Sequence, residues 1–346
     1  MCVFLLITFA TLEVCARLDD RFATGAAILS NYDFDQLFKF DGATMRGIPH
    51  ARFAKWKLNS IGMRGPEPRL LPNQTRILVY GASEVFGIYE APGYEMPASL
   101  ERQIQKVRPN YHFEVFNGGI PGMRVGSGTS FIKELGHRLH PTVVIIYPTP
   151  THYIGVTRPH CGRTFRSPRE RDTKAWPASR VFAKFVPEIK SLLPPVLLQS
   201  ARLMLIKKEL HGRPVLLRVP EASIDAFETD LNCAIDAVQA IGAVPILVTH
   251  ASRFATVNQD GDGYWLTGWR AQYPELDERG FIDLELRANQ RIRRVAFARN
   301  MILAPADTVV GGKAVNFADH AHFSDQGAAE MAGLLTDAVL QSAREK

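Results

Sequence analysis

The 346-residue sequence has few cysteines and none of the common metal or nucleotide motifs. Its four cysteines (Cys2, Cys15, Cys161 and Cys233) lie far apart without a C-x-x-C pair, so neither a zinc site nor a disulfide framework is indicated and the redox compartment stays open. No G-x-G-x-x-G follows the first predicted strand, which argues against a dinucleotide fingerprint. No zinc-finger spacing or RNA-binding signature occurs, so nucleic acid is not an expected partner.

The sequence also lacks a long hydrophobic run. Residues 1–16 are mostly apolar, but they fall short of the roughly 20 residues that span a bilayer, and Glu13 interrupts them. They have no basic n-region and no clear cleavage site. We interpret residues 1–18 as a possible membrane anchor or signal remnant, which predicts a membrane-associated or extracytoplasmic protein. The alternative is a buried helix of a soluble, cytoplasmic protein.

Positive charge is concentrated in one part of the chain. The net charge is +6, but residues 157–220 contain fourteen Lys/Arg against four Asp/Glu and so carry +10, which leaves −4 for the rest. We interpret residues of about 151–220 as a basic insertion. It is either a solvated segment or a surface for an anionic partner, of which an anionic membrane is one.

What the sequence does contain is a regular alternation of strands and helices, which predicts an α/β fold. The predicted strands are 77–80, 113–116, 141–147, 243–249 and 301–303, and the predicted helices are 94–107, 125–139, 195–210, 224–241, 284–300 and 325–343. The pattern predicts three α/β/α layers around a doubly wound, largely parallel five-stranded sheet within one domain, 19–346. Residues 19–72 form an N-terminal wrap. Residues 258–263 resemble a calcium loop but lack its final glutamate, so we predict a turn.

A serine follows the first predicted strand. Gly81 and Ala82 let the backbone turn sharply where the strand stops, which lifts the Ser83 hydroxyl out of the sheet. If a helix begins there, free backbone N–H groups lie beside the hydroxyl. Ser83 is therefore either a nucleophile or an ordinary helix N-cap.

Glycines follow the second predicted strand. Asn117-Gly-Gly-Ile-Pro-Gly122 has three glycines within six residues. Here the backbone turns with positive φ or approaches a ligand closely, and at the carboxyl end of a strand the second is common.

A third group of polar residues precedes the last predicted helix. Asp319 and His322 are three residues apart, so one turn can direct both side chains into the same cleft. A serine nucleophile needs a base, and a base imidazole needs a partner that fixes its tautomer. Ser83, His322 and Asp319 suit these roles. His320 is the rival base, and a loop-capping pair is the structural alternative.

Together these residues resemble the SGNH hydrolases, also called the GDSL esterase family. The resemblance runs from about Leu58 to the C-terminus, with the basic insertion outside the shared core. It implies a flavodoxin-like fold, Ser83 as nucleophile, His322 and Asp319 as the other triad members, and the N–H groups of Ser83 and Gly119 as oxyanion donors. It also implies that no metal or organic cofactor takes part.

The chain departs from the family pattern at two places. Ala82 replaces the usual aspartate, and Thr149-Pro-Thr-His152 replaces the block that normally carries an oxyanion-donating asparagine. Thr151 occupies the place of that asparagine, and Thr149 or His152 is the alternative donor. Losing one such donor typically removes roughly 2.7–4 kcal/mol of transition-state stabilisation.

The predicted function is serine-dependent hydrolysis of a small-molecule or glycan acyl ester through an acyl-enzyme. Two alternatives remain open at this point. One is an O-acyltransferase that acts on a cell-surface glycan. The other is a catalytically inactive, membrane-tethered binding or scaffold protein of the same fold. The sequence does not indicate an oligomeric state.

Overall fold

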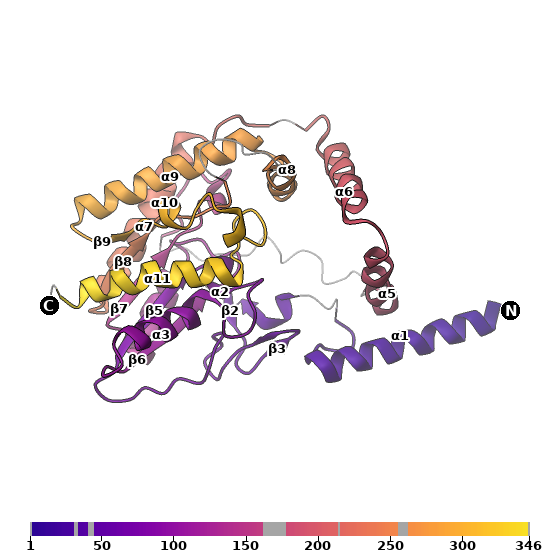
Figure 1. The fold of residues 1–346 in the computed structure, drawn as a ribbon, viewed down its shortest axis with the longest axis horizontal. Coiled ribbons are helices and arrows are strands. Elements are labelled where there is room, and N and C mark those ends of the chain that lie inside the picture. Colours follow the sequence, from indigo (N-terminus) through magenta and orange to yellow (C-terminus); the bar gives the residue numbers. More distant parts are fainter. Residues whose placement is uncertain are drawn as a thin grey trace.

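The centre of the protein is a parallel sheet of five strands (Figure 1). The computed structural model describes residues 2–30, 34–40, 45–161, 178–213, 215–254 and 262–344. The strands are β5 (Thr75–Gly81), β6 (Phe113–Gly119), β7 (Val143–Tyr147), β8 (Val244–Val248) and β9 (Ile302–Ala304). Their order is β6-β5-β7-β8-β9, and every neighbouring pair is parallel. This confirms the predicted doubly wound sheet, in the flavodoxin-like order.

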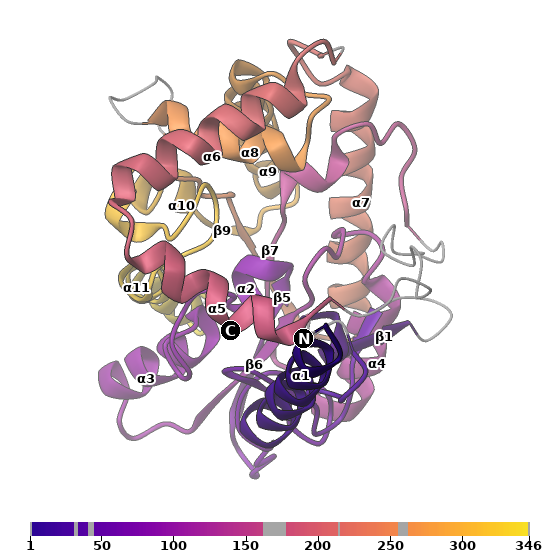
Figure 2. The same cartoon turned by 90° about the vertical axis from the view of Figure 1, so that its right-hand side faces the viewer.

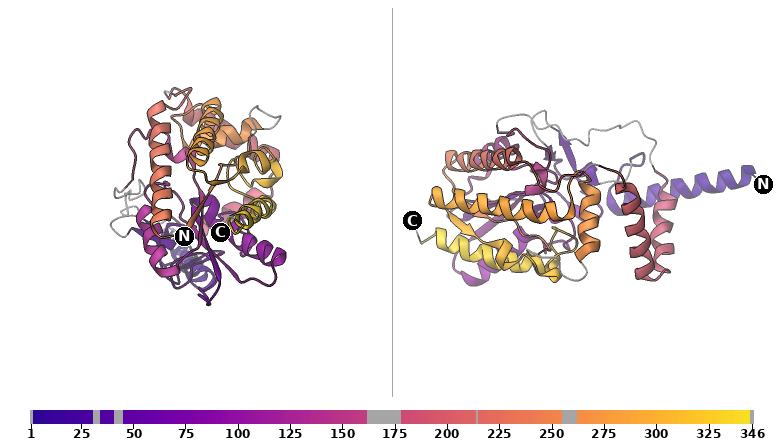
Figure 3. Two further views of the ribbon diagram at one scale, coloured as in Figure 1. Left: turned by 90° about the vertical axis from the view of Figure 1, so that its left-hand side faces the viewer. Right: turned by 90° about the horizontal axis from the view of Figure 1, so that it is seen from above.

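Both faces of the sheet are covered because its strands are apolar on both sides. In β5, Leu78 and Tyr80 point into one apolar core, and Ile77 and Val79 point into the other. The end-on view shows helices on both sides of the sheet (Figure 3, left). The first core contains α4 (Thr129–Leu139), α7 (Glu221–Ala240) and α9 (Glu278–Ala298); the second contains α3 (Met96–Val107) and α11 (Asp325–Ser342).

The N-terminal wrap contains short elements that the sequence did not predict. They are η1 (Phe34–Leu37) and two antiparallel pairs, β1 (Phe38–Phe40) with β2 (Met45–Gly47) and β3 (Arg52–Phe53) with β4 (Trp56–Lys57). Leu37, Phe53 and Leu58 pack in one cluster with Phe86. Buried Arg64 donates to the carbonyl oxygens of Phe86, at 3.0 Å, and Gly87. The wrap therefore supports the turn that follows β5.

Four further helices surround the carboxyl edge of the sheet, where its strands end. They are α1 (Cys2–Thr24), α5 (Arg180–Ser191), α6 (Pro195–Leu210) and α8 (Asp262–Gln272). Helix α1 projects away from the sheet, and α5 and α6 lie across the side toward which the strands run (Figures 1 and 2). Helix α6 was predicted; α5 and α8 were not. Two short helices, α10 (Ala306–Val309) and η3 (Ala314–Asn316), complete this edge.

Three predictions concern segments near these helices. Within the described ranges, no helix is long and apolar enough to cross a bilayer. Helix α1 is continuous through residue 18, the predicted end of the anchor. Residues 162–177 of the basic insertion, and most of the turn predicted at 258–263, lie outside the described residues.

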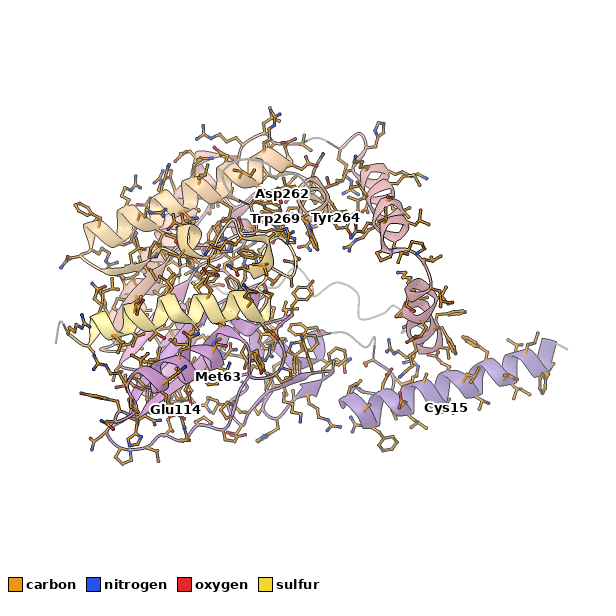
Figure 4. All side chains as sticks on the ribbon, viewed as in Figure 1. Cys15, Met63, Glu114, Asp262, Tyr264 and Trp269 are labelled. Atoms are coloured by element: carbon orange, nitrogen blue, oxygen red, sulfur yellow. A yellow bond between two sulfur atoms is a disulfide. The ribbon has the colours of Figure 1, made fainter. Side chains whose placement is uncertain are left out.

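A disulfide corrects the interpretation of the cysteines. Cys161 and Cys233 are 72 residues apart in sequence, yet they are bonded, and Cys15 is free and exposed on α1 (Figure 4). The bond joins the loop after η2 (Pro150–Tyr153) to α7. Buried Asp230, one turn earlier on α7, accepts hydrogen bonds from the backbone N–H groups of His160 and Cys161 at 2.7 and 2.8 Å. The sequence spacing of Cys161 and Cys233 did not predict this bond, because only the topology of the fold brings the two cysteines together.

Candidate active site

Ser83 lies at the topological switch point of the sheet. Strand β5 ends at Gly81, and a single helical turn, α2 (Ser83–Phe86), follows and ends at Gly87 with φ of 83°. A side chain at Gly81 would place its Cβ 2.7 Å from the Tyr147 carbonyl oxygen of β7, so only glycine fits there. In this strand order, ligands bind outside the carboxyl ends of the two strands between which the order reverses, here β5 and β7.

The three predicted triad residues meet at this edge. The His322 Nε2 atom lies 2.9 Å from Ser83 Oγ, and His322 Nδ1 lies 2.8 Å from Asp319 Oδ2. The other Asp319 oxygen accepts the backbone N–H groups of Ala321 and His322, both at 2.9 Å. An ionised carboxylate only accepts hydrogen bonds, so Nδ1 carries the proton and the Nε2 lone pair faces the serine. This is the arrangement that a serine nucleophile and its base require.

The charges of these groups suit proton transfer. Burial alone would raise the pKa of Asp319, but the hydrogen bond and charge of His322 outweigh it and hold the pKa well below its usual range. Burial acts in the opposite direction on His322, yet the Asp319 carboxylate raises the pKa of the imidazole. Asp319 therefore stays ionised near neutral pH and stabilises a cationic His322.

The rival base, His320, does not reach the serine. Its ring is buried and stacks on Trp269, with centroids 4.8 Å apart. Burial lowers the pKa of His320 to about 4, so it is neutral near pH 7. Tyr89, which was not predicted, lies beside the triad instead. Its ring contacts the His322 ring edge-on at 5.5 Å, and burial followed by the Asp319 carboxylate raises the pKa of its phenol.

A second histidine and two carboxylates lie directly behind the nucleophile, and the sequence did not reveal them. Glu84 Oε2 is 3.2 Å from Ser83 Oγ, and Glu84 Oε1 is 3.3 Å from His250 Nε2. The other ring nitrogen, His250 Nδ1, is 2.7 Å from Glu285 Oε2. All three of these titratable residues are buried. They form a chain from the nucleophile into the core.

The second histidine is a cation. Burial alone would lower the pKa of His250, but the charge and hydrogen bond of Glu285, followed by those of Glu84, raise it to about 10. Burial opposes ionisation of Glu84 as well, yet the hydrogen bond and charge of His250 lower the pKa of that carboxyl to about 2. The chain therefore holds a buried imidazolium between two carboxylates throughout the neutral pH range.

The prediction that the Gly119 N–H donates to the oxyanion is wrong. Its N–H donates to Asn117 Oδ1 at 3.0 Å, and its Cα packs so closely on Phe86 that a Cβ would lie 2.2 Å from the Phe86 nitrogen. Gly122, three residues later, is the better candidate. It has φ of 78° in a turn closed by the Met123 N–H and the Ile120 carbonyl, and no hydrogen bond engages its N–H within the part of the chain that the structure describes.

Only one of the three residues considered as a substitute for the asparagine remains suitable. The Thr149 hydroxyl donates to both oxygens of Glu84, at 3.2 Å each. His152 Nδ1 lies 3.0 Å from the Met123 carbonyl, and burial lowers the pKa of this imidazole, so its Nε2 carries a lone pair and no proton. Thr151 is buried, and its hydroxyl acts to lower the pKa of Tyr273 against the larger effect of burial. No carboxylate or backbone carbonyl of the described residues accepts a hydrogen bond from this hydroxyl, so Thr151 is kept as the candidate donor.

Comparisons with known proteins identify similar solved structures. Neither a protein-family model nor a curated protein matches the sequence. A lipase/acylhydrolase from Enterococcus faecalis is 13% identical with a TM-score of 0.43, over 76% of this chain and 94% of the other. A GDSL-like lipase from Bacteroides thetaiotaomicron is 14% identical with a TM-score of 0.40, over 78% and 89%. A catalytic mutant of an acetylxylan esterase from Geobacillus stearothermophilus is 15% identical with a TM-score of 0.43, over 77% and 94%.

The fold of this chain follows from its own sheet order and register. Within the described ranges, no group of three or more His, Cys, Asp or Glu side chains has the geometry to hold a metal ion. The expectation that no cofactor is used stays a prediction.

Two local signals pointed to residues that the sequence interpretation missed. Pro121-Gly122 is the typical central pair of a type II turn, in which the glycine has positive φ and its N–H is not part of the turn's own hydrogen bond. His250 lies two residues after the end of a buried strand, where ligand-contacting residues gather in parallel sheets. Neither signal names a chemical role by itself.

Proposed function

We propose that this protein is a serine-dependent ester hydrolase that works through an acyl-enzyme. One observation carries the proposal: the unbroken line of hydrogen bonds from Ser83 Oγ through His322 to Asp319, at 2.9 and 2.8 Å, at the switch point of a parallel sheet. A structural cap would not need a third group aligned behind its histidine.

In the first half of the proposed reaction, His322 Nε2 takes the Ser83 hydroxyl proton as Oγ attacks the ester carbonyl carbon. The carbonyl π electrons move to the oxygen, which becomes an oxyanion. The N–H of Ser83, at the start of α2, and that of Gly122 are the proposed donors, with Thr151 as the candidate third. When the tetrahedral intermediate collapses, the C–O bond to the alcohol breaks and the His322 Nε2 proton passes to the leaving oxygen.

In the second half, water replaces the alcohol. His322 takes a proton from the water as its oxygen attacks the acyl carbon, and a second tetrahedral intermediate forms. Its collapse returns the proton to Ser83 Oγ and releases the carboxylic acid. Asp319 keeps its charge throughout and holds the imidazole in the productive tautomer. If a sugar hydroxyl replaces the water, the same steps accomplish acyl transfer.

The activity test is hydrolysis of p-nitrophenyl acetate by the wild type, Ser83→Ala and Ser60→Ala. Ser60 is exposed and serves as the matched serine control. We expect activity in the wild type and in Ser60→Ala, and loss of activity in Ser83→Ala. A fluorophosphonate should label Ser83 alone, as detected by peptide mass spectrometry. If the wild type is inert on a panel of acyl esters and Ser83 stays unlabelled, the scaffold alternative is correct.

The transferase alternative is tested by product analysis. Wild-type protein is supplied with an acyl ester together with an oligosaccharide acceptor, and free acid and acylated sugar are quantified. Free acid as the main product supports a hydrolase. Acylated sugar formed in preference to free acid, and lost in Ser83→Ala, identifies an O-acyltransferase.

We also propose that the protein works in an oxidising compartment. The Cys161–Cys233 disulfide supports this, since such bonds persist outside the reducing cytosol. Non-reducing peptide mapping of the protein isolated from its native cells tests it. Recovery of Cys161 and Cys233 as a linked peptide supports the proposal, whereas recovery of both as free thiols contradicts it.

A further inference from the structure

The outer helices present a continuous apolar surface, which we call the docking surface. It consists of the N-terminal half of α1 (residues 3–12) and an apolar stripe that begins on α5 and continues into α6. The stripe residues are all exposed: Phe182, Phe185, Val186, Ile189, Leu192, Leu193, Val196 and Leu197. Those on α5, from Phe182 to Ile189, have the spacing of an amphipathic helix, and apart from the contact of Phe182 with Phe9 on α1 no described element covers them.

The first part of α1 is apolar on every side. Residues 3–12 contain no charged side chain, and all of them are exposed, with Phe4 at 73% and Leu6 at 68%. A helix that is apolar all round is normally buried in a protein core or in hydrocarbon. Ten helical residues span about 15 Å, or half of a roughly 30 Å hydrocarbon layer.

Polar contacts hold α1 and α5 together, so the two apolar parts form one surface. The Glu13 carboxylate accepts the backbone N–H groups of Arg180 and Val181, at 2.9 and 3.1 Å, where α5 begins. Further along α1, Asp20 pairs with Arg180. The rings of Phe9 and Phe182 are 5.6 Å apart. A partner that binds the apolar residues of α1 therefore also contacts those of α5.

Positive charge borders the docking surface. The described residues 178–213 contain seven Lys/Arg against two Asp/Glu, a net charge of +5. Lys190, Lys207 and Lys208 are exposed near the stripe or on the helix that continues from it. An exposed apolar face bordered by lysines is the pattern of helices that lie in the headgroup region of anionic membranes.

The docking surface is on the side of the molecule that holds the candidate active site. Figure 2 shows α5 and α6 in front of the carboxyl edge of the sheet. Arg202 of α6 is 3.4 Å from the hydroxyl of Tyr264 on α8, and Tyr264 lies at the side of the body nearest α6 (Figure 4). A flat surface that meets α1 and α5 is therefore on the same side as Ser83.

We propose that the docking surface binds an anionic lipid bilayer. The N-terminal half of α1 enters one leaflet, the stripe of α5 and α6 lies at the acyl boundary, and the lysines contact the lipid headgroups. A second copy of this chain accounts less well for these features, because two such surfaces would bring the same lysines together. The proposal concerns membrane attachment and holds whether or not Ser83 is a nucleophile.

Vesicle flotation with the full chain tests the proposal. Vesicles of phosphatidylcholine are compared with vesicles that also contain phosphatidylglycerol. We expect the wild type to float with the anionic vesicles, and added salt to weaken this binding. Substituting Phe185→Ser, Ile189→Ser and Leu192→Ser together removes three apolar side chains from the stripe and should weaken binding at least about tenfold.

Matched variants control for apolar loss and test the charge. Val107→Ser, Tyr111→Ser and Phe297→Ser together replace three apolar side chains that are equally exposed elsewhere, so this variant should bind as the wild type does. Replacing Lys190, Lys207 and Lys208 by glutamate should abolish the preference for anionic vesicles. Since all of these positions are exposed, thermal unfolding should change little, which is checked separately.

Several outcomes would overturn the proposal. It is wrong if the wild type does not float with anionic vesicles, or if the stripe variant binds them as tightly as its control variant does. Equal binding to neutral and anionic vesicles, unchanged by the lysine substitutions, overturns the role of lipid charge. A dimer in vesicle-free solution that dissociates in the stripe variant shows that the occupant is a second copy of the chain.

Discussion

Two histidines with similar hydrogen bonds lie near the nucleophile, and one partner in those hydrogen bonds differs. His322 and His250 each have a carboxylate on Nδ1, from Asp319 at 2.8 Å and from Glu285 at 2.7 Å. On Nε2, His322 faces a hydroxyl, whereas His250 faces the Glu84 carboxylate. The atom opposite Nε2 therefore distinguishes a base from a fixed cation.

This difference sets which ring can change its charge. A hydroxyl gives up its proton to His322 and takes it back, so that ring alternates between its neutral and cationic forms. Two carboxylates hold His250 as a cation, with its pKa raised to about 10 against the opposing effect of burial. His322 is therefore suited to act as the base, and His250 neutralises the buried carboxylates behind the nucleophile. Substitutions that exchange these properties test the comparison.

The largest expected effect is on activity, in His322→Asn. This change removes the base but leaves a side chain able to hydrogen-bond, so we expect kcat to fall roughly 10⁴- to 10⁶-fold. Because His322 is partly exposed and Asp319 keeps its two hydrogen bonds from backbone N–H groups, the melting temperature should change by only a few degrees. The measurements are ester hydrolysis and thermal unfolding of the same preparation. Retained activity would show that another group is the base.

The next effect is on stability, in His250→Asn. Without the imidazolium, Glu84 and Glu285 stay buried without their cation, and breaking a buried ion pair in this way costs about 3–5 kcal/mol of unfolding free energy. Urea unfolding measures the change. The double variant Glu84→Gln with His250→Asn should recover part of the loss, because one uncompensated charge is gone. A stability equal to that of the wild type would show that the chain is not held by charge.

The sequence predicted more of the first histidine's surroundings than of the second's. Asp319 and His322 are three residues apart, and Ser83 follows a predicted strand of apolar residues, so local pattern was enough. Glu84 and His250 are 166 residues apart, and no local pattern pairs them. The same reason hid the Cys161–Cys233 bond.

The oxyanion donor and the outer helix were missed for other reasons. The family resemblance pointed to Gly119, but the side chain of Asn117 accepts the Gly119 N–H, a contact that the sequence does not show. Helix α5 was missed although Phe182, Phe185, Val186 and Ile189 have helical spacing, because this part of the basic insertion was interpreted only from its charge. The parallel sheet, in contrast, followed directly from the alternation of strands and helices, and its flavodoxin-like order from the family resemblance.

A smaller effect comes from Glu90, an acid near His322 whose pKa is raised. Burial raises the pKa of Glu90 to about 7, despite the opposing backbone hydrogen bonds and the charges of Arg64 and His322. A carboxyl whose folded pKa exceeds its unfolded value loses stability as the pH rises from about 4.5 through 7. Glu90→Gln should therefore raise unfolding free energy by about 2 kcal/mol more at pH 8 than at pH 5. A stabilisation that is larger at pH 5 would contradict this sign.

The smallest effect, and the one that links the two histidines, is expected from Glu84→Gln. The Glu84 carboxylate is among the charges that raise the pKa of His322, after the burial that lowers it and the contribution of Asp319. Glu84→Gln removes this anion, which by itself lowers the His322 pKa. His250 keeps its positive charge through Glu285, and that charge, no longer offset by Glu84, lowers the His322 pKa further. Since the neutral imidazole is the active base, the acidic limb of kcat/KM should move toward lower pH.

The plateau of activity in Glu84→Gln should fall by less than about tenfold, because the hydrogen bonds of the triad itself are intact. Glu134→Gln, an exposed acid on α4 that pairs with Arg138, is the matched control and should leave the limb unmoved. A purely structural Glu84 would lower the melting temperature without moving the limb. A limb displaced toward higher pH would mean that Glu84 opposes the His322 cation, and the coupling between the two histidines would then have the opposite sign.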